Sequence, residues 1–366
     1  MFDELEAVIN AEKKRIEQQR LWITNFRRMM DSLPDLGEPW FEKRLSIEII
    51  PRISDVTKIA AIDGGLISEA MSGFDLILYR AVGVVFQGVG SKVNASYVPS
   101  IDPVPEVFFH PSLSSRHEFS RLSTLKRLYI EYKTVIDTIN NYNPTIVFID
   151  GKLSPLNQDF IEYSNSVIKQ AELDVKEIYR ELIDVAHKKG TILCGIVKDS
   201  RSSEFCNQLI RNLHIWINDQ SIGLGTLSGW RKNLENISDE FMLSHFLSDK
   251  ARTAWLKSSL PKWVSGGDKF ILASYVKAAH FDFPIRFEVL SDGTMVPEKL
   301  QLAISALLVL TNHGLPSAIP TIIIEADDRA KLTQHHLEMV LDQISIQLDI
   351  PLEILRKRRH FYSQLS

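Results

Sequence analysis

The amino-acid sequence predicts an α/β fold in which an antiparallel meander is continued by parallel strands. Strand-like segments follow one another early in the chain with turns and no strong helix between them, which favours antiparallel pairing. These segments are Lys58 to Ile62, Phe74 to Phe86 and Lys92 to Val98. Two later runs, Thr145 to Ile149 and Thr191 to Val197, are separated by a helical segment, which favours parallel pairing.

The first element is a long amphipathic helix over Met1 to Leu33, closed by Pro34 and Gly37. Steps of three and four residues give a mostly apolar seam, interrupted by Glu12 and Gln19. Two interpretations stay open: the helix packs on its own domain, or it is a dimerisation element. We therefore expect residues 1–40 to form an N-terminal helix, and residues 41–366 to form the main domain with an insertion at about 200–268.

The remaining elements follow from periodicity and from glycine and proline positions. Pro103, Pro105 and Pro111 predict a loop. Helices are expected at about His117 to Asn140, Phe160 to Lys188, Glu298 to Thr311 and from Glu325 onward. Further strands are expected at Phe270 to Val276, Pro284 to Leu290 and Ile319 to Ile324. The tryptophan-rich insertion is expected to pack a small core of its own.

Composition excludes several classes of protein. With 45% hydrophobic and 24% charged residues, the chain is neither collagen-like nor wholly disordered. Its apolar runs are too short to cross a bilayer. Its two cysteines, Cys194 and Cys206, cannot build a disulfide framework, which favours a reducing compartment, and we expect a cytoplasmic protein. The net charge of −4 argues against a basic coat for nucleic acid but allows a local basic channel.

Two strand-like runs end in the same way, at Asp63-Gly64-Gly65 and at Asp150-Gly151. An aspartate at a strand end, next to glycine, projects into a crevice that a ligand can approach. Carboxylates on neighbouring strands can share Mg²⁺ or Mn²⁺, which prefer oxygen ligands. The alternative is that each aspartate merely begins a turn.

A third carboxylate is expected from the helix that precedes Asp150. Measured from the apolar stripe of this helix, Glu131 lies roughly 90° away on the flank, whereas Asp137 lies roughly 150° away toward solvent. Glu131 can therefore reach a crevice between helix and sheet. A surface ion pair is the alternative role for Glu131.

Basic and acidic side chains elsewhere offer further candidates. Lys198 and Arg201 follow a strand and could bind phosphate, although a polar loop would look the same. Glu325, Asp327 and Arg329 lie at an expected helix start, where acidic residues also act as caps. The basic run Arg356 to Arg359 could contact DNA or remain solvated. The sequence contains no P-loop, HExxH, CxxC or GxSxG motif, which disfavours those enzyme classes.

In their order, these motifs resemble the NurA family of DNA-end-processing nucleases, over about Ile59 to Leu332. The resemblance rests on Ile62-Asp63-Gly64-Gly65, Leu78-Tyr79-Arg80-Ala81, Glu131, Phe148-Ile149-Asp150-Gly151, Gly195-Ile196-Val197-Lys198-Asp199-Ser200 and Ile324-Glu325-Ala326. It implies an RNase H-like core, a homodimer, and work with a HerA-type hexameric ATPase in DNA end resection and repair. It also implies 5′–3′ exonuclease and single-strand endonuclease activity.

Carried over residue by residue, the resemblance implies that Asp63, Glu131 and Asp150 bind Mn²⁺ or Mg²⁺. Two such ions would orient a water and stabilise the attacking and leaving oxygens. The resemblance implies that Lys198 lies near the DNA phosphates and takes part in catalysis. Asp327 stands where many relatives have histidine, so its role as a metal ligand stays open.

Lys152, Arg201 and Arg329 join Lys198 as expected DNA contacts. Two rival functions remain. One is a non-catalytic dimeric subunit of a translocase complex, motivated by Asp327. The other is an actin-like or sugar-kinase-type phosphotransferase, which also uses paired Asp-Gly strand ends but needs a further glycine-rich turn that this chain offers poorly.

Overall fold

The computed structural model describes residues 2–31, 36–51, 58–71, 73–88, 93–111, 115–154, 165–198, 203–218, 227–261, 263–264, 269–280, 282–291, 297–311 and 318–349. Arg201 and the basic run Arg356 to Arg359 lie outside these residues. The chain forms two compact units. The first unit comprises residues 1–54, 195–259 and 268–320, and the second comprises residues 55–194, 260–267 and 321–366. No helix among the described residues is long and apolar enough to span a membrane.

The second unit is built on a mixed sheet with strand order β7-β6-β2-β3-β4. Its strands are β2 (Lys58–Ala70), β3 (Phe74–Gln87), β4 (Asn94–Val98), β5 (Glu106–Pro111), β6 (Ile146–Asp150) and β7 (Ile192–Val197), the last of which ends in the first unit. Strand β3 pairs antiparallel with β2, β4 and β5, whereas β2 and β6 are parallel. The predicted α/β fold, in which an antiparallel meander is continued by parallel pairing, is confirmed.

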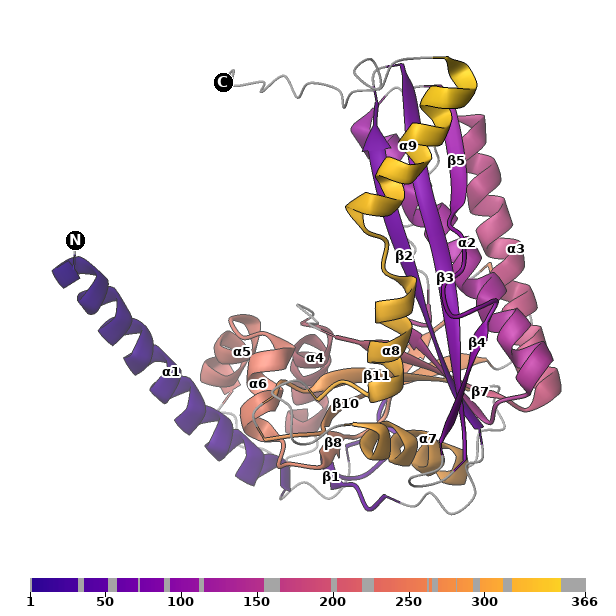
Figure 1. The fold of residues 1–366 in the computed structure, drawn as a ribbon. Helices are drawn as coiled ribbons and strands as arrows, with labels where there is room; N and C mark the ends of the chain where they lie inside the picture. The colour runs from indigo at the N-terminus through magenta and orange to yellow at the C-terminus, as the bar shows by residue number, and fades with distance from the viewer. Residues whose placement is uncertain are drawn as a thin grey trace. The chain divides into compact units, whose positions relative to one another are not determined.

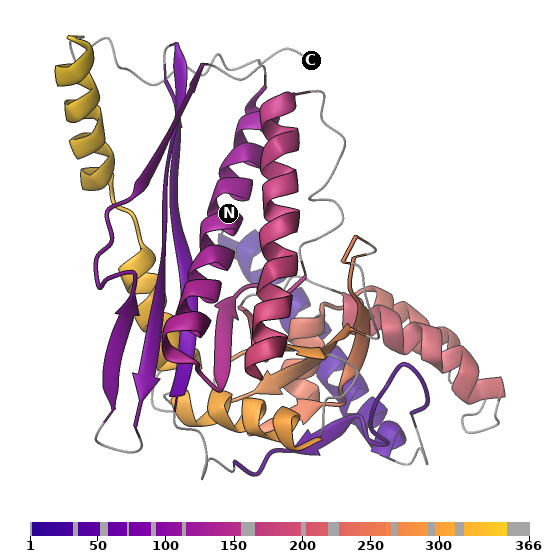
Figure 2. The same ribbon diagram turned by 90° about the vertical axis from the view of Figure 1, so that its right-hand side faces the viewer.

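Helices cover both faces of this sheet. Figures 1 and 2 show α2 (Arg116–Tyr142) and α3 (Ser166–Lys189) on one face, and α8 (Thr321–Ala330) and α9 (Gln334–Leu348) on the other. Helix α2 begins at Ser115, whose hydroxyl accepts the amide of Glu118, and ends at Asn143, whose left-handed backbone closes the last turn. Most of the apolar stripe predicted for this helix is buried, which fixes the face on which Glu131 lies. The buried residues of the stripe are Leu125, Tyr132, Val135, Ile136 and Ile139.

The prediction that a strand ends at Asp63 is wrong. Strand β2 continues through Asp63, Gly64 and Gly65 as far as Ala70, paired with β3 along its whole length. A Gly-Gly pair usually signals a turn, but here the glycines provide space for neighbouring elements, as described below.

The predicted strand at Ile319 to Ile324 is also wrong, because α8 begins at Thr321. The apolar residues of this segment recur at helical spacing, with Ile322, Ala326 and Ala330 buried on one side. A short apolar run does not by itself distinguish a buried strand from a buried helix. The helix expected from Glu325 onward is in fact α8 followed by α9.

The loop predicted from its prolines is observed at Pro103 and Pro105, but the chain from Glu106 to Pro111 forms β5. Strand β5 pairs with the first part of β3, from Phe74 to Tyr79. Only Pro111 falls inside the strand, at its last residue, where the missing N–H is tolerated. The remaining expected helices and strands are observed with shifted ends where the structure describes them.

A small core fixes the far end of the β2–β3 hairpin. Leu337 of α9 is buried against Met71, Phe74, Leu76 and Leu78, and further apolar side chains of α9 pack around this cluster. Helix α9 is therefore anchored on the hairpin, beyond the sheet region that carries Asp63.

The first unit contains an antiparallel sheet of order β1-β8-β10-β11, with β9 paired to β10. Its strands are β1 (Ser46–Glu48), β8 (Ala251–Thr253), β9 (Leu256–Ser259), β10 (Phe270–Lys277) and β11 (Ile285–Ser291). Its helices are α1 (Phe2–Asp31), α4 (Glu204–Asn218), α5 (Leu227–Glu235), α6 (Asp239–Phe246) and α7 (Pro297–Leu310). The segment expected as an insertion therefore shares a unit with the N-terminal helix. The domain limits at residues 40 and 41 stay a prediction.

The two halves of α1 differ in their surroundings. Ile23, Phe26 and Met30 belong to the core of the first unit, where Phe26 packs against Trp230 with ring centroids 4.9 Å apart. In contrast, Leu5 and Ile9 are 54% and 55% exposed. Packing on its own domain thus accounts for the second half of the helix and leaves the first half available.

Candidate metal centre

Three aspartates from three elements converge in the second unit. Asp63 lies within β2, Asp150 is the last residue of β6, and Asp327 lies in α8. The parallel register pairs Ile62 with Ile149, which places Asp63 and Asp150 at the same level of neighbouring strands. One carboxylate oxygen from each aspartate lies within 4.8 Å of the other two. Such a group of hard oxygen atoms can bind a divalent cation.

Burial and charge perturb Asp63. Its burial, followed by the nearby charge of Asp150, raises the pKa of Asp63 to about 8, although the amide of Gly64 donates to its Oδ1 at 2.7 Å and opposes the rise. Glu131 and a hydrogen bond with Asp327 add to the rise. Asp63 is buried, Asp150 half-buried and Asp327 exposed, so the group opens toward solvent on the side of α8.

Glu131 lies beside this group on α2, as its helical phase predicts. It is 5% exposed and burial raises its pKa to about 7, while Arg127, with Nε 3.5 Å from Glu131 Oε1, opposes the rise. Its charge also acts on Asp63. Glu131 is not part of the three-aspartate group, and Asp137, the rejected candidate, is exposed. The role of Glu131 as a metal ligand stays a prediction.

The two glycines after Asp63 allow close packing on both faces of β2. A β-carbon on Gly64 would overlap the side chain of Glu131, and one on Gly65 would overlap the backbone carbonyl of Ala330 in α8. Glycine is therefore required here by the approach of α2 and α8 rather than by a turn. These contacts bring Glu131 and Asp327 to the strand that carries Asp63.

Arg80 fixes the end of α8, a role that the sequence analysis missed. It is 5% exposed, and it donates through Nε to the carbonyl of Ala330 at 3.1 Å and through Nη2 to the carbonyl of Lys331 at 2.9 Å. Its Nη1 donates to Asp102 Oδ1 at 2.7 Å and to the carbonyl of Pro103 at 3.0 Å. A cation at the C-terminus of a helix satisfies its last carbonyls. The sequence feature that could have indicated this role is a charged arginine within the mostly apolar strand β3.

Glu325 and Tyr97 form a second network that the sequence analysis missed. Tyr97 of β4 donates its hydroxyl to Glu325 Oε1 at 2.8 Å, and Arg329 Nε donates to the same oxygen at 2.9 Å. Arg329, an expected DNA contact, is therefore ion-paired with Glu325, while its side chain is 40% exposed. Two acidic residues of α8 thus have separate roles: Glu325 belongs to this network and Asp327 to the metal centre.

The other expected DNA contacts stay predictions. Lys152 follows Asp150-Gly151 in the second unit and is half-buried. Lys198 directly follows β7 and belongs to the first unit, so its contact with phosphate and its catalytic role stay predictions. Arg201 lies outside the described residues.

The family model of the NurA domain matches residues 57–332, which include every residue of this centre. The chain belongs to the NurA family. Membership confirms the resemblance that the sequence shows to this family. In this NurA chain, the carboxylate of Asp327 lies within reach of Asp63 and Asp150.

Solved structures agree with this fold. The NurA nuclease from Sulfolobus solfataricus is 14% identical, with a TM-score of 0.55 over 93% of this chain and 97% of that one. A NurA structure bound to dAMP and manganese is 12% identical, with a TM-score of 0.46 over 98% and 100% of the two chains. Ciona intestinalis Endonuclease V in complex with DNA is 12% identical, with a TM-score of 0.32 over 88% and 99%. Only the first similarity is strong enough to support the fold. None of the curated proteins compared with the chain matches it.

Proposed function

We propose that this NurA chain is a divalent-metal-dependent deoxyribonuclease that hydrolyses phosphodiester bonds at Asp63, Asp150 and Asp327. The observation that carries the proposal is the convergence of these three carboxylates, on three separate elements, within the NurA domain. Because the elements are far apart in sequence, packing rather than chain proximity brings the aspartates together.

The residues fit a hard divalent cation. The donors are all carboxylate oxygens, which suits Mg²⁺ or Mn²⁺. The raised pKa values of Asp63 and Glu131 reflect burial and the repulsion of neighbouring carboxylates. A divalent cation offsets this repulsion, so these side chains are arranged for a positive charge among them.

A bound Mn²⁺ or Mg²⁺ lowers the pKa of a water and stabilises charge on the phosphodiester oxygens. Asp63 and Asp150 would hold the cation from paired strands, and Asp327 would add a ligand from α8. Binding requires Asp63 to release the proton that its carboxyl retains near neutral pH. Burial also raises the pKa of Glu131, to about 7, and Glu131 is a fourth carboxylate beside the three aspartates.

Cleavage of end-labelled linear DNA tests the nuclease. We expect single- and double-stranded substrates to be degraded with Mn²⁺ or Mg²⁺ and to survive in EDTA. Asp63→Asn and Asp150→Asn should each lower the rate at least about 100-fold, because each removes charge needed for metal binding. Asp137→Asn, on the exposed face of α2, is the matched control and should retain activity.

Cleavage in EDTA, or full activity in the Asp63→Asn and Asp150→Asn variants, would exclude this site as the nuclease centre. A wild-type protein that never cuts, with or without a translocase, would favour the non-catalytic subunit. Labelling the 5′ and 3′ ends separately distinguishes the proposed 5′–3′ exonuclease from single-strand endonuclease activity.

Family resemblance supports a HerA-type ATPase as the partner, in DNA end processing for repair in the cytoplasm. The sequence has no P-loop of its own, so energy for translocation has to come from another chain. We expect a HerA-type ATPase with ATP to increase degradation of long duplex DNA. No increase, and no co-migration of the two proteins in gel filtration, would exclude that partner.

The exposed half of α1 supports a homodimer. Leu5, Val8 and Ile9 are 54%, 65% and 55% exposed on one stretch of helix. A second copy of the same helix would bury them in a two-fold contact. We expect sedimentation velocity to show a dimer that Leu5→Glu with Ile9→Glu converts to a monomer. Lys13→Glu with Lys14→Glu is the control for altered charge, and equal sedimentation of all three proteins would exclude this contact.

A further inference from the structure

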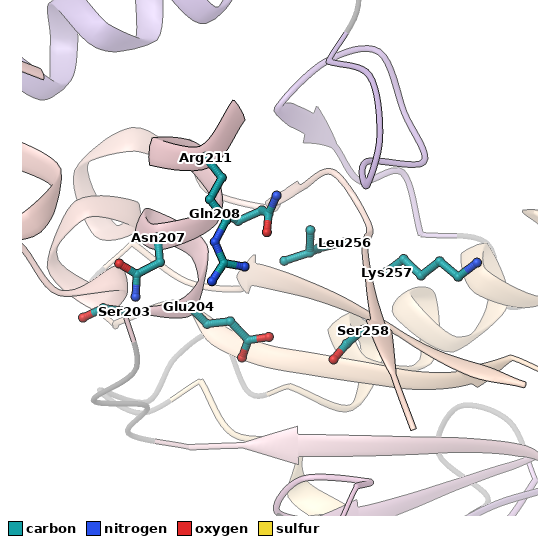
Figure 3. Close-up of a pocket in the computed structure, with 8 residues that line it drawn as sticks. All are labelled: Ser203, Glu204, Asn207, Gln208, Arg211, Leu256, Lys257 and Ser258. Atoms are coloured by element: carbon teal, nitrogen blue, oxygen red, sulfur yellow. The ribbon is translucent and has the colours of Figure 1, made fainter. Parts of the chain in front are cut away.

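A polar hollow in the first unit lies between α4 and β9. It has a volume of about 470 Å³. Figure 3 shows the side chains that line it. The polar side chains with hydrogen-bond donors are Ser203, Asn207, Gln208, Arg211, Lys257 and Ser258. None of them belongs to the metal centre, so the hollow requires a separate explanation.

The α4 side of the hollow follows from helical spacing. Ser203, Asn207 and Arg211 recur every four residues, with Ser203 directly before the helix, so they lie along one face of α4. In Figure 3 the guanidinium of Arg211 extends toward the side where Asn207 and Glu204 lie. Arg211 forms no hydrogen bond or ion pair with any residue that the structure describes. Its five N–H donors are thus available to a ligand.

Glu204 is the carboxylate in the hollow, and it is held by an arginine outside it. Glu204 Oε2 lies 2.6 Å from Nη1 of Arg286, a buried arginine whose Nε also donates to Glu288 at 2.8 Å. This pair holds Glu204 in place, although the side chain of Glu204 is 40% exposed. Because Arg286 is shared with Glu288, Glu204 keeps a negative charge that counts against the cations of the hollow.

Lys257 adds a second cation at the rim. Its Nζ lies 4.4 Å from the ring centroid of Phe270, and Figure 3 shows its side chain extending away from Arg211. Arg211 and Lys257 together outweigh Glu204 by one charge. A phosphodiester carries one negative charge, and guanidinium binds its two free oxygens in a bidentate geometry.

We infer that this hollow binds a phosphate group of a single DNA strand, with Arg211 as its main ligand and Asn207, Ser203 and Ser258 as neutral donors. The inference rests on the proposed nuclease function for its substrate class. The inference assigns to the first unit a contact that contributes to the affinity for DNA but takes no part in cleavage, because none of the side chains that line the hollow is suited to cleavage. Phosphate contacts of this kind position a strand without reading its sequence.

Binding of a fluorescent oligothymidylate in EDTA tests the inference without cleavage. We expect Arg211→Gln to weaken binding about fivefold at low salt. Each phosphate contact on a single strand contributes about 0.7 to the slope of log affinity against log salt, and the slope should fall by that amount. Lys257→Gln should have a smaller effect. Arg231→Gln is the matched control, because Arg231 is an exposed arginine of the same unit whose Nε lies 2.7 Å from Glu235.

Unchanged affinity and slope in Arg211→Gln, or an equal loss in Arg231→Gln, would overturn the inference. Titration with inorganic phosphate and dAMP separates the sources of the anion. If Arg211→Gln weakened binding of these two ligands and left binding of the oligonucleotide unaffected, the hollow would bind a free phosphorylated molecule, and the assignment to a DNA strand would be wrong.

The kinetics of cleavage with Mn²⁺ give a further test. Arg211→Gln should raise KM and leave kcat unchanged. A lower kcat in Arg211→Gln would also overturn the inference about the hollow. A protein that binds single strands through Arg211 but never cuts them would contradict only the proposed nuclease function.

Discussion

Asp63 combines two properties that conflict in the absence of a cation. Its backbone is fixed between β3 and β6, and its carboxyl is buried beside Asp150 and Glu131. The side chain cannot move away from its neighbours without disturbing a central strand. The protonated, neutral carboxyl of Asp63 therefore has the lower free energy in this buried position, which explains the rise in its pKa.

The stability of the metal-free protein should therefore fall as pH rises from about 4 to about 8. The folded protein retains protons on Asp63 and Glu131, with pKa values of about 8 and about 7, whereas the unfolded chain releases them near 3.8 and 4.5. Rising pH thus favours unfolding, with a slope of at most about 1.4 kcal/mol per pH unit for each group. Urea unfolding in EDTA at several pH values measures this slope.

Asp63→Asn should flatten this pH dependence and be more stable than the wild type at pH 8, because an amide has no charge to bury. Asp137→Asn, on the exposed face of α2, should keep the wild-type slope. An unchanged slope in Asp63→Asn would show that Asp63 is ionised throughout, contrary to its surroundings.

Gly64 and Gly65 should respond differently to alanine. In Gly64→Ala the new methyl group meets Glu131, whose side chain can rotate, so we expect lost cleavage with a modest loss of about 1 kcal/mol in stability. In Gly65→Ala it meets the backbone of Ala330, which cannot move without α8, and about 3 kcal/mol is expected.

Chemical denaturation of both glycine variants, with cleavage assays, makes the comparison. Gly229→Ala is the control, because nothing lies within 4 Å of a β-carbon at that helical position, and it should be neutral or stabilising. Equal losses of stability in Gly64→Ala and Gly65→Ala would contradict the distinction between a mobile side chain and a fixed backbone.

Sequence reasoning found some of these residues and missed others for physical reasons. Asp63 and Asp150 follow apolar strand residues next to glycine, a pattern visible in the sequence, and the phase of α2 separates Glu131 from Asp137. The role of Arg80 depends on the carbonyls of Ala330 and Lys331, some 250 positions away, and no local pattern encodes that distance.

At the scale of elements, α8 decides whether the centre has a third aspartate. The helix is ten residues long, and the carbonyls of its last residue, Ala330, and of the following Lys331 accept hydrogen bonds from Arg80 of β3. So short a helix derives little stability from its own hydrogen bonds and depends on tertiary contacts. The position of Asp327 is therefore set by β3 as much as by α8.

Arg80→Met should lower stability by roughly 3 kcal/mol, because it leaves buried carbonyls without a donor. It should also weaken binding of Mn²⁺, measured by electron paramagnetic resonance of the free ion, since α8 loses its attachment. Asp102→Ala is the control, because the side chain of Asp102 is 73% exposed and the other bonds of Arg80 remain. Wild-type affinity for Mn²⁺ in Arg80→Met would show that α8 is held by other contacts.

The elements that the sequence predicts well are those whose length and periodicity agree. Strands β3 and β6 and helix α2 are long or uniformly apolar, and their limits match within a few residues. The errors at β2, β5 and α8 share a cause: glycine, proline and isoleucine each have two structural uses, and only the tertiary neighbours decide between them.

At the scale of the molecule, the described carboxylates of the metal centre all belong to the second unit, so metal binding should stabilise that unit. At a free Mn²⁺ concentration of 100 times the dissociation constant, the expected gain is about 2.7 kcal/mol. Hydrogen exchange with mass spectrometry should show added protection in β2, β6 and α8, and little change in α5 and α6. Asp150→Asn should abolish the gain, and protection spread evenly over both units would contradict this assignment.

The anchoring of α9 on the β2–β3 hairpin has a consequence for mutations remote from the site. Three residues connect α8 to α9, so the segment that carries Asp327 is tethered downstream by Leu337 in its cluster with Met71 and Phe74. A defect at the tip of the hairpin would loosen that tether and act on the metal centre through the chain itself. These apolar positions therefore bear on the geometry of the metal centre as well as on folding, although none of them belongs to the group of aspartates.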